Sequence, residues 1–279
     1  MLPLTLVKVG GAIVESATSL QSLLDKFARI PGLKVLVHGG GRSATRIAEQ
    51  LGIPQTMIAG RRVTDAETLR VVTMVYAGLV NKNIVAQLQA RGVNAFGLTG
   101  ADMNVIQSHK RRPKKVSAAD VPADCPVAQP GPDETTKLVD YGFVGDIDQV
   151  NATLLADLIQ KGVVPVISPI GHDTHGTLLN TNADTIASEV AKALAQCFQV
   201  RLMYCFEKRG VLRNPDDEDS VISRITSADF PQLVSDGTVS GGMLPKLENA
   251  FSAIASGVNE VVITRADAID QPEAGTHLC

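Results

Sequence analysis

Two glycine-rich runs follow short apolar segments near the start of the chain. Residues 8–11 read KVGG and residues 38–41 read HGGG. Glycines between a strand and a helix let backbone N–H groups approach an anion closely, and the positive end of the helix dipole adds to the attraction. Each run alone could be no more than a tight turn, and neither is a Walker A loop or a GxGxxG fingerprint. Two such runs on successive strands nevertheless predict a shared anion site.

Two lysines occupy positions that are unfavourable without an anionic neighbour. Lys8 lies inside an apolar strand segment, on the same side as Leu4 and Leu6, and a buried ammonium group is costly unless it is paired. Lys246 follows Pro245 in the first turn of a predicted helix, where a cation opposes the helix dipole at a cost of about 0.3–1 kcal/mol. A snorkelling side chain, or chance, could explain each lysine separately. Together they indicate an anionic ligand.

Polar side chains at two further strand or helix ends could complete such a site. Asn182 is a good helix N-cap, and Asp184 then lies in the first turn, where a carboxylate is favoured. Capping alone would explain both residues. Asn180 is not needed for the cap, and we expect it to point into the same crevice. Arg62 precedes a predicted helix and could hold a carboxylate through two hydrogen bonds, or could be an ordinary surface arginine.

This inventory suits phosphoryl transfer, which is catalysed mainly by positioning and charge neutralisation. A carboxylate acceptor fits best, because it is already a nucleophile and needs no general base. The sequence has no Ser-His-Asp set, no Cys/His dyad and no metal-ligand cluster, so no protein-bound metal is predicted. Four histidines near polar loops are expected to be exposed: His109, His172, His175 and His277. The four cysteines are interpreted as reduced thiols: Cys125, Cys197, Cys205 and Cys279.

Short apolar runs alternate with helical patterns along the chain. The predicted strands are Leu4–Val9, Lys34–His38, Val93–Leu98, Val163–Ile167, Val200–Phe206 and Glu260–Thr264. The predicted helices are Leu20–Arg29, Ser43–Leu51, Asp65–Ala90, Ala152–Gln160, Ala183–Ala195 and Leu247–Ala255. This order predicts a three-layer αβα sandwich with a central, mostly parallel sheet. Ligands of such sheets bind at the carboxyl ends of the strands, where the two glycine runs fall.

Composition narrows the function classes. The chain has 279 residues, of which 44% are hydrophobic, so it can form a large core in one domain or two lobes. Its net charge of −3 argues against a dedicated nucleic-acid binder. No apolar run reaches the roughly 18 residues that a membrane span needs, and no secretory signal is expected. We therefore expect a cytoplasmic protein that acts on a small molecule, without a nucleic-acid or membrane partner.

Residues 109–137 break the alternating pattern. They hold five of the 14 prolines, and their only large aliphatics are Val116, Val121 and Val127. Such a segment buries too little apolar surface to offset its ordering entropy, so we expect a long flexible surface loop. The basic run at 110–115 is interpreted as a solvated loop base, with a phosphate or nucleic-acid contact as the alternative.

The predicted helix Asp65–Ala90 is too apolar to have a single buried face, because Val71, Met74, Val75 and Leu79 spread beyond one stripe. A second buried face predicts a subunit interface, and hence a homodimer.

Five motifs in order resemble those of the amino-acid kinase family: KVGG at 8–11, HGGG at 38–41, GRRVT at 60–64, NTNAD at 180–184 and SGGMLPK at 240–246. They are most similar to those of the members that phosphorylate N-acetyl-L-glutamate in arginine biosynthesis. The resemblance implies that the γ-phosphoryl group of ATP passes to the side-chain carboxylate, giving an acyl phosphate. It also implies Mg²⁺ bridging the phosphates, with few direct protein ligands.

The resemblance assigns roles residue by residue. Lys8 and Lys246 match the lysines that stabilise the transition state, and Asp184 matches the aspartate that orients both. The positions that hold the acylated amino acid are matched by Gly40, Gly41, Arg62 and Asn180. The nucleotide-binding positions are matched by Gly10, Gly11, Glu207, Gly210, Val211, Leu212, Ser240 and Gly241. Residues 1–170 would form an N-lobe that binds the amino acid and dimerises, and residues 171–279 a C-lobe that binds the nucleotide.

Two departures from the family pattern leave alternatives open. The nucleotide loop reads FEKRGV at 206–211 where the family has TDVxGV, which affects the base and ribose contacts. The insertion at 109–137 replaces a short hairpin beside the acyl group, so an N-succinyl-L-glutamate kinase is an alternative. A glutamate 5-kinase, and a non-catalytic nucleotide-binding regulator, are further alternatives.

Overall fold

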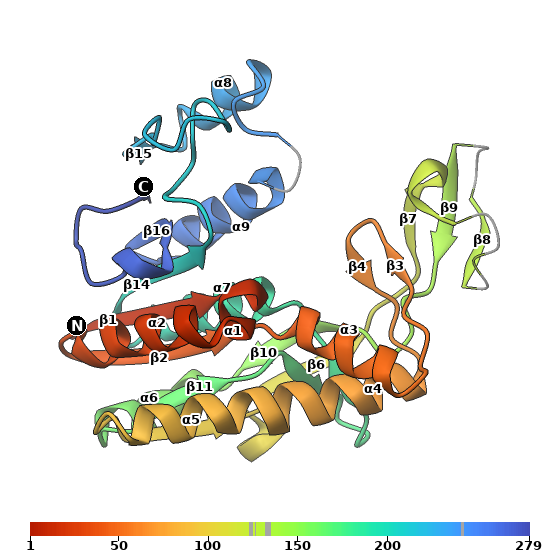
Figure 1. Ribbon diagram of the computed structural model, residues 1–279, viewed down its shortest axis with the longest axis horizontal. Coiled ribbons are helices and arrows are strands. Elements are labelled where there is room, and N and C mark those ends of the chain that lie inside the picture. Colours follow the sequence, from red (N-terminus) through yellow and green to blue (C-terminus); the bar gives the residue numbers. More distant parts are fainter. Residues whose placement is uncertain (123–124, 126, 132–134, 241–242) are drawn as a thin grey trace.

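An eight-stranded sheet runs through the protein (Figure 1), which we describe from a computed structural model covering residues 1–122, 125, 127–131, 135–240 and 243–279. Its strand order is β15-β17-β16-β14-β1-β2-β11-β5. The six predicted strands are all in it and run parallel: β1 (Pro3–Val9), β2 (Leu33–His38), β5 (Ala95–Leu98), β11 (Val164–Ile167), β14 (Gln199–Phe206) and β16 (Glu260–Arg265). At one edge, β17 (Thr276–Leu278) is antiparallel to β16, and β15 (Arg224–Ile225) is parallel to β17.

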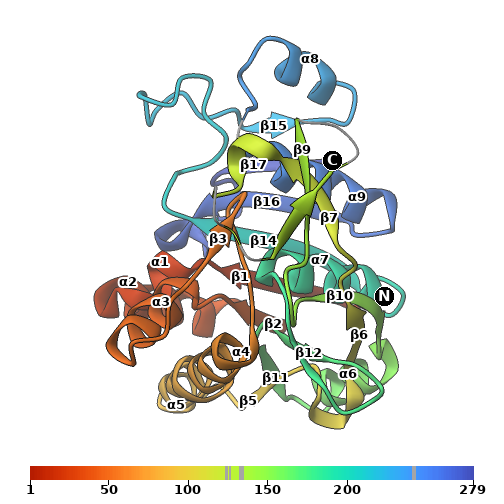
Figure 2. The ribbon, with the colours of Figure 1, turned by 90° about the vertical axis from the view of Figure 1, so that its right-hand side faces the viewer.

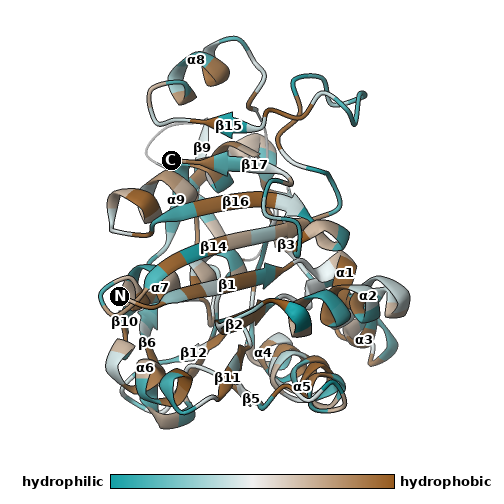
Figure 3. Ribbon diagram, turned by 90° about the vertical axis from the view of Figure 1, so that its left-hand side faces the viewer, coloured by the Kyte–Doolittle hydropathy of each residue, from teal (hydrophilic) through white to brown (hydrophobic). Residues whose placement is uncertain are grey.

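Helices cover both faces of this sheet (Figure 2). One face carries α6 (Ala152–Gln160), α7 (Ala183–Leu194) and α9 (Leu244–Ala255), which pack on alternate strand residues such as Leu4 and Leu6. The other face carries α1 (Gly11–Glu15), α2 (Ala17–Arg29), α3 (Gly41–Gln50) and the long helix α4–η1–α5, which pack on Val7 and Val9. Strands buried on both faces are mostly apolar, as Figure 3 shows for β16, whose hydrophilic residues lie at its two ends. The predicted three-layer α/β sandwich is confirmed.

The long helix runs without a break through α4 (Ala66–Thr73), a π-helical stretch η1 (Met74–Val80) and α5 (Asn81–Gln89), as predicted. Asp65 caps its start by accepting a hydrogen bond from Thr68 N at 2.7 Å. One side packs on the sheet, whereas Met74 and Leu79 are 56% and 58% exposed. By length and composition the helix could cross a membrane, which is weak evidence because core helices share these properties.

A second, four-stranded sheet was not predicted as a unit. Its order is β10-β6-β12-β13, with β6 at Ile106–Lys110, β10 at Gly145–Val150, β12 at Ile170–His172 and β13 at Leu178–Asn180. Its last strand ends at Asn180 and leads directly into α7, so it delivers the polar run at 180–184 to the main sheet. The remaining short helices are α8 (Phe230–Ser235), η2 (Asp102–Asn104), η3 (Ala118–Asp120) and η5 (Ala266–Ala268).

The expected long surface loop at 109–137 holds regular structure in the residues that the structure describes, whereas the flexibility of the segment stays a prediction. These residues form a three-stranded antiparallel sheet, β7-β9-β8, from β7 (Lys114–Ser117), β8 (Ala128–Pro130) and β9 (Thr136–Val139). It stands beside the hairpin β3 (Met57–Ile58)–β4 (Arg61–Arg62), at the right of Figure 1. Ile58, Val139 and Tyr141 share a small apolar core there. The segment itself has few aliphatic residues, but it packs against apolar residues outside it, so its own composition underestimates the apolar surface that it buries.

Candidate active site

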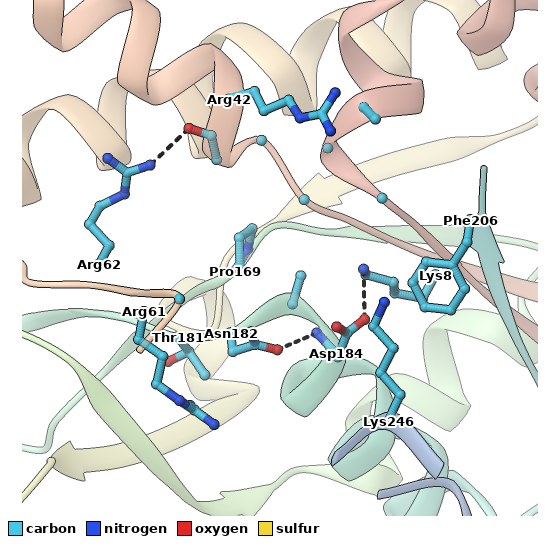
Figure 4. A pocket seen from close by; sticks show the side chains of 18 of the residues that line it. Lys8, Arg42, Arg61, Arg62, Pro169, Thr181, Asn182, Asp184, Phe206 and Lys246 are labelled. Carbon is cyan, nitrogen blue, oxygen red and sulfur yellow. Dashed lines mark hydrogen bonds and ion pairs between the residues drawn. The ribbon is translucent and has the colours of Figure 1, made fainter. Parts of the chain in front are cut away.

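A crevice of about 560 Å³ opens where the main strands end. Parallel pairing places Lys8 of β1 beside Tyr204 of β14 and Val37 of β2, so the glycine turns after β1 and β2 meet the loop after β14. Most of the predicted site residues line this crevice: Lys8, Gly10, Gly11, Gly40, Gly41, Arg62, Asn180, Asp184, Glu207, Gly210 and Lys246 (Figure 4). The two glycine runs thus line one crevice, and its use as an anion site stays a prediction.

Lys8 has the negative partner that its burial demands. The residue is 6% exposed, and its Nζ lies 2.6 Å from Asp184 Oδ1. The helix cap is made separately, because Asn182 Oδ1 accepts from the backbone N–H groups of Asp184 and Thr185 at 2.8 and 3.2 Å. Capping therefore accounts for Asn182 and leaves the Asp184 carboxylate free to pair with Lys8.

Lys246 enters the same centre from the first turn of α9. Its Nζ lies 3.7 Å from the centroid of the Phe206 ring, and Lys8 Nζ lies 5.4 Å from that centroid. Burial lowers the pKa of Lys246, Asp184 opposes that change, and Lys8 adds to it. Three charged groups from β1, α7 and α9 thus converge in one place, as Figure 4 shows.

The second glycine turn is packed too closely for side chains at Gly39 and Gly40. A Cβ atom at Gly39 would lie 3.3 Å from Gly11 N, and one at Gly40 would lie 2.9 Å from the ring of Tyr76. Hydrogen bonds from Gly10 N to Cys205 O and from Gly39 N to Val9 O fix both turns to the strand ends. The crevice is therefore lined there by backbone, which suits an anion.

His38 holds the second turn from below as a neutral ring. It is fully buried; its Nδ1 lies 2.8 Å from Gly39 O, and its Nε2 lies 3.0 Å from Asn81 Nδ2. The amide nitrogen of Asn81 is a donor, so Nε2 is the accepting nitrogen and Nδ1 carries the proton. Burial lowers the pKa of His38 to about 4, partly opposed by the Gly39 hydrogen bond.

Arg62 and Asn180 line the opposite side of the crevice. The Arg62 guanidinium donates to Gly41 O and Thr45 Oγ1, each at 2.9 Å, and also to Gln55. Asn180 Nδ2 donates to Thr64 Oγ1 at 3.0 Å. Neutral acceptors hold Arg62 in place, and no carboxylate from the described part of the chain pairs with it.

The predicted nucleotide loop divides into lining and buried residues. Glu207 and Gly210 line the crevice, and Glu207 Oε1 lies 3.9 Å from Arg42 of α3. Val211 and Leu212 are buried and do not line it; Val211 N donates to Thr276 Oγ1 at 2.8 Å. Ser240 is exposed outside the lining, and Gly241 lies outside the described residues. The loop beyond Gly210 is thus anchored in the C-terminal core.

Several lining residues of the crevice were not predicted, and Tyr76, Arg111 and Tyr141 are among them. Tyr76 of η1 covers Gly40 with its ring, and burial raises its pKa. Arg111 is only 6% exposed, and it donates to Asp146 Oδ1 from Nε and a terminal nitrogen at 3.0 and 2.6 Å. The interpretation of the basic run as a solvated loop base is therefore wrong for Arg111. Tyr141 extends the lining toward the β3–β4 hairpin. In the sequence, only the valines near the basic run could have indicated that Arg111 is buried.

The histidine prediction holds for His109 and His175 but not for the other two. His172 is half-buried, with its Nε2 2.7 Å from Asn104 Oδ1, and His277 is half-buried against Glu260. In the part of the chain that the structure describes, no three His, Cys, Asp or Glu side chains are grouped as metal ligands. The four cysteines are free.

The fold and crevice define a class: an α/β enzyme that places lysines, arginines and glycine turns around an anion, as a phosphotransferase does. A model of the amino acid kinase family matches residues 3–265, and the chain belongs to that family. The expected family resemblance is confirmed.

The most informative relatives are similar over almost their whole length. The chain is 62% identical over 275 residues to the acetylglutamate kinase of Bacteroides thetaiotaomicron, covering 99% of this chain and 98% of the relative. It is 38% identical over 263 residues to the acetylglutamate kinase of Methanopyrus kandleri, covering 94% and 95%. Among solved structures it is similar to a Streptococcus mutans UA159 protein (TM-score 0.73, 26% identity, 99% and 98% covered). Carbamate kinase of Giardia lamblia bound to AMP-PNP shares the fold (TM-score 0.66, 14% identity, 99% and 98% covered).

Proposed function

We propose that the protein transfers the γ-phosphoryl group of ATP to the side-chain carboxylate of N-acetyl-L-glutamate, as in arginine biosynthesis. The observation that carries the proposal is the cluster of buried Lys8 with half-buried Asp184 and Lys246 in a crevice lined by glycines. The 62% identity to an acetylglutamate kinase supports the substrate.

The reaction needs no general base. A carboxylate oxygen of the substrate attacks the γ-phosphorus, the bond to the β,γ-bridging oxygen breaks, and ADP leaves with that electron pair. Lys8 and Lys246 neutralise the charge on the transferring group, and Asp184 orients both. Gly40, Gly41, Arg62 and Asn180 hold the amino acid, with Arg62 on its α-carboxylate. The nucleotide contacts Gly10, Gly11, Glu207 and Gly210. The buried Val211 and Leu212 support this loop from behind.

Mg²⁺ accompanies ATP in this proposal, and it supplies further charge neutralisation on the phosphate oxygens when bound. The described residues offer no ready-made ligand cluster. Bound together with ATP, the ion would take few protein ligands, as is usual for Mg²⁺ with nucleotides.

We further propose a cytoplasmic homodimer in which residues 1–170 bind the amino acid and residues 171–279 bind the nucleotide. The exposed Met74 and Leu79 on the long helix support the interface, since large apolar side chains rarely gather on a free surface. Light scattering tests it: a monomeric mass at micromolar concentration contradicts the dimer.

A hydroxamate assay tests the activity, because hydroxylamine traps acyl phosphates. The purified protein is incubated with ATP, Mg²⁺ and each of three acceptors: N-acetyl-L-glutamate, N-succinyl-L-glutamate and free glutamate. We expect hydroxamate with an acylated substrate and little with free glutamate. A preference for free glutamate supports a glutamate 5-kinase, and no turnover with any acceptor supports a non-catalytic regulator.

One observation favours N-succinyl-L-glutamate as a second candidate. Arg61 lines the crevice, and among the described residues no hydrogen bond or ion pair engages its side chain. An unpaired arginine matches the extra carboxylate of a succinyl group. Arg61→Gln should then raise KM for the succinylated substrate by roughly tenfold or more and leave KM for the acetylated one nearly unchanged. Equal effects on both substrates remove this argument.

A further inference from the structure

Phe206 places an aromatic face against both lysines of the site. Its ring centroid lies 3.7 Å from Lys246 Nζ and 5.4 Å from Lys8 Nζ. The ring belongs to the last residue of β14 and stands in the crevice next to the cluster (Figure 4). An ammonium group within about 6 Å of a ring centroid is attracted by the negative face of the ring, and the attraction grows when water is excluded.

The ring is held in that position by the fold. Phe206 follows Tyr204 by two residues on one strand, so both side chains lie on the same face of the sheet. The two rings are stacked, with centroids 6.1 Å apart and planes 9° from parallel. Tyr204 is 2% exposed and pairs in register with Lys8 across β1 and β14. Phe206 is thus fixed by a buried neighbour rather than by the ligand.

The charges around Lys246 do not balance without the nucleotide. The groups that face Lys246 are Lys8 from β1 and Asp184 from α7, so two cations share one carboxylate. Glu207 and Lys208 after β14, and Arg42 of α3, line the same crevice. Burial and the charge of Lys8 both disfavour the ammonium form of Lys246, and only Asp184 opposes them. A second carboxylate here would repel the phosphates of a nucleotide, whereas an aromatic face stabilises a cation without carrying net charge.

We propose that Phe206 is a positioning residue for phosphoryl transfer, which keeps Lys246 charged and directed toward Lys8 and Asp184 before the nucleotide binds. The expected change in kcat rests on the proposed kinase activity. The expected effect of the ring on the charge of Lys246 does not, because it can be measured in the unliganded protein.

The test compares Phe206→Leu, which keeps apolar volume but removes the ring, with Phe206→Tyr, which keeps the ring. We expect Phe206→Leu to lower kcat by about 5- to 30-fold. The pH above which activity falls should also be lower in this variant. Phe206→Tyr should keep kcat and the pH profile close to those of the wild type. The matched control is Phe230→Leu, because Phe230 packs on Phe251 at 5.1 Å and faces no lysine; it should leave kcat and the pH profile unchanged.

A measurement without turnover separates this inference from the proposed function. The ¹³Cε signal of Lys246, assigned by Lys246→Arg, is titrated in the unliganded protein. Phe206→Leu should lower the pKa of Lys246 by about 1, which corresponds to a tenfold weaker preference for the charged form. Should Phe206→Leu not fold, fluorinated phenylalanines at 206 keep the shape of the ring and weaken its negative face, and the pKa should fall with each added fluorine. An unchanged pKa, or a raised KM for ATP with normal kcat, overturns the proposal by making Phe206 a packing or nucleotide contact.

Discussion

Asp184→Asn tests the centre of the proposed mechanism, because asparagine keeps the shape of the side chain and removes its charge. Asn182 still caps α7, so the helix itself should persist. Lys8 loses the partner that lies 2.6 Å away, and the two side chains are only 8% and 19% exposed. Removing one member of a buried ion pair costs about 3–5 kcal/mol, and the partial exposure of Asp184 places our expectation near 3 kcal/mol.

The kinetic effect should exceed what that loss of stability explains. Removing a preorganised electrostatic group lowers kcat by roughly 100- to 1000-fold, and we expect at least 100-fold at a temperature where the variant is folded. The hydroxamate assay measures kcat, and urea unfolding measures stability. Nucleotide affinity should change less, because most of the proposed ATP contacts lie elsewhere.

A matched control is Asp270→Asn. Asp270 pairs with Lys26 at 2.9 Å, its side chain is 27% exposed, and it lies outside the crevice. This more exposed pair should contribute about 1 kcal/mol or less, with no change in kcat. A folded Asp184→Asn protein whose kcat stays within a few-fold of the wild type would refute the orienting role and leave only a structural ion pair.

Two further predictions address the other side of the crevice and the turn beneath it. Arg62→Ala should chiefly raise KM for the acylated amino acid, because the charge of an α-carboxylate does not change during transfer. Lys246→Ala should chiefly lower kcat. Steady-state kinetics with both substrates varied measure the two effects, and the reverse pattern would contradict these roles. His38 is buried with a pKa of about 4 against 6.5 in the unfolded chain, so its contribution is complete above pH 6.5 and is lost as the pH falls toward 4. Urea unfolding should show a loss of about 3 kcal/mol over that range, and His38→Gln should remove this part of the slope.

The main sheet and the centre of the site could be predicted because their signals are local. Strands buried on both faces are continuous apolar runs, and each of the six lies within one or two residues of its expected bounds. Lys8 stood out as a charge inside such a run, and its physical requirement for an anion led correctly to a paired group. The starts of two helices could be predicted for the same reason, because Asn182 and Asp65 are residue types that cap helices and both do so in the structure.

The second sheet and the β7–β9 sheet could not be predicted because their stability is not local. Strands of three or four residues carry too little pattern, and Val139 is buried against Ile58 and Val63, which come from a distant segment. Arg111 looked like part of a solvated basic run, and its burial depends on Asp146, which lies 35 residues further on. Tyr76 resembled any apolar residue of a core helix until its ring was placed against Gly40.

The distribution of charge explains why overall composition says so little about this site. The whole chain carries a net charge of −3. Among the described residues the crevice is lined by seven cations (Lys8, Arg42, Arg61, Arg62, Arg111, Lys208 and Lys246) against two anions, Asp184 and Glu207. Such a surplus inside a concave surface focuses the field on anionic ligands even when the molecule as a whole repels them. It also costs stability while the crevice is empty, which is why Lys8 and Arg111 each have a carboxylate and Arg62 has three neutral acceptors. Lys246 packs instead on the face of the Phe206 ring. When its ammonium group moves from the ring toward the nucleotide, no unpaired negative charge is left facing the phosphates.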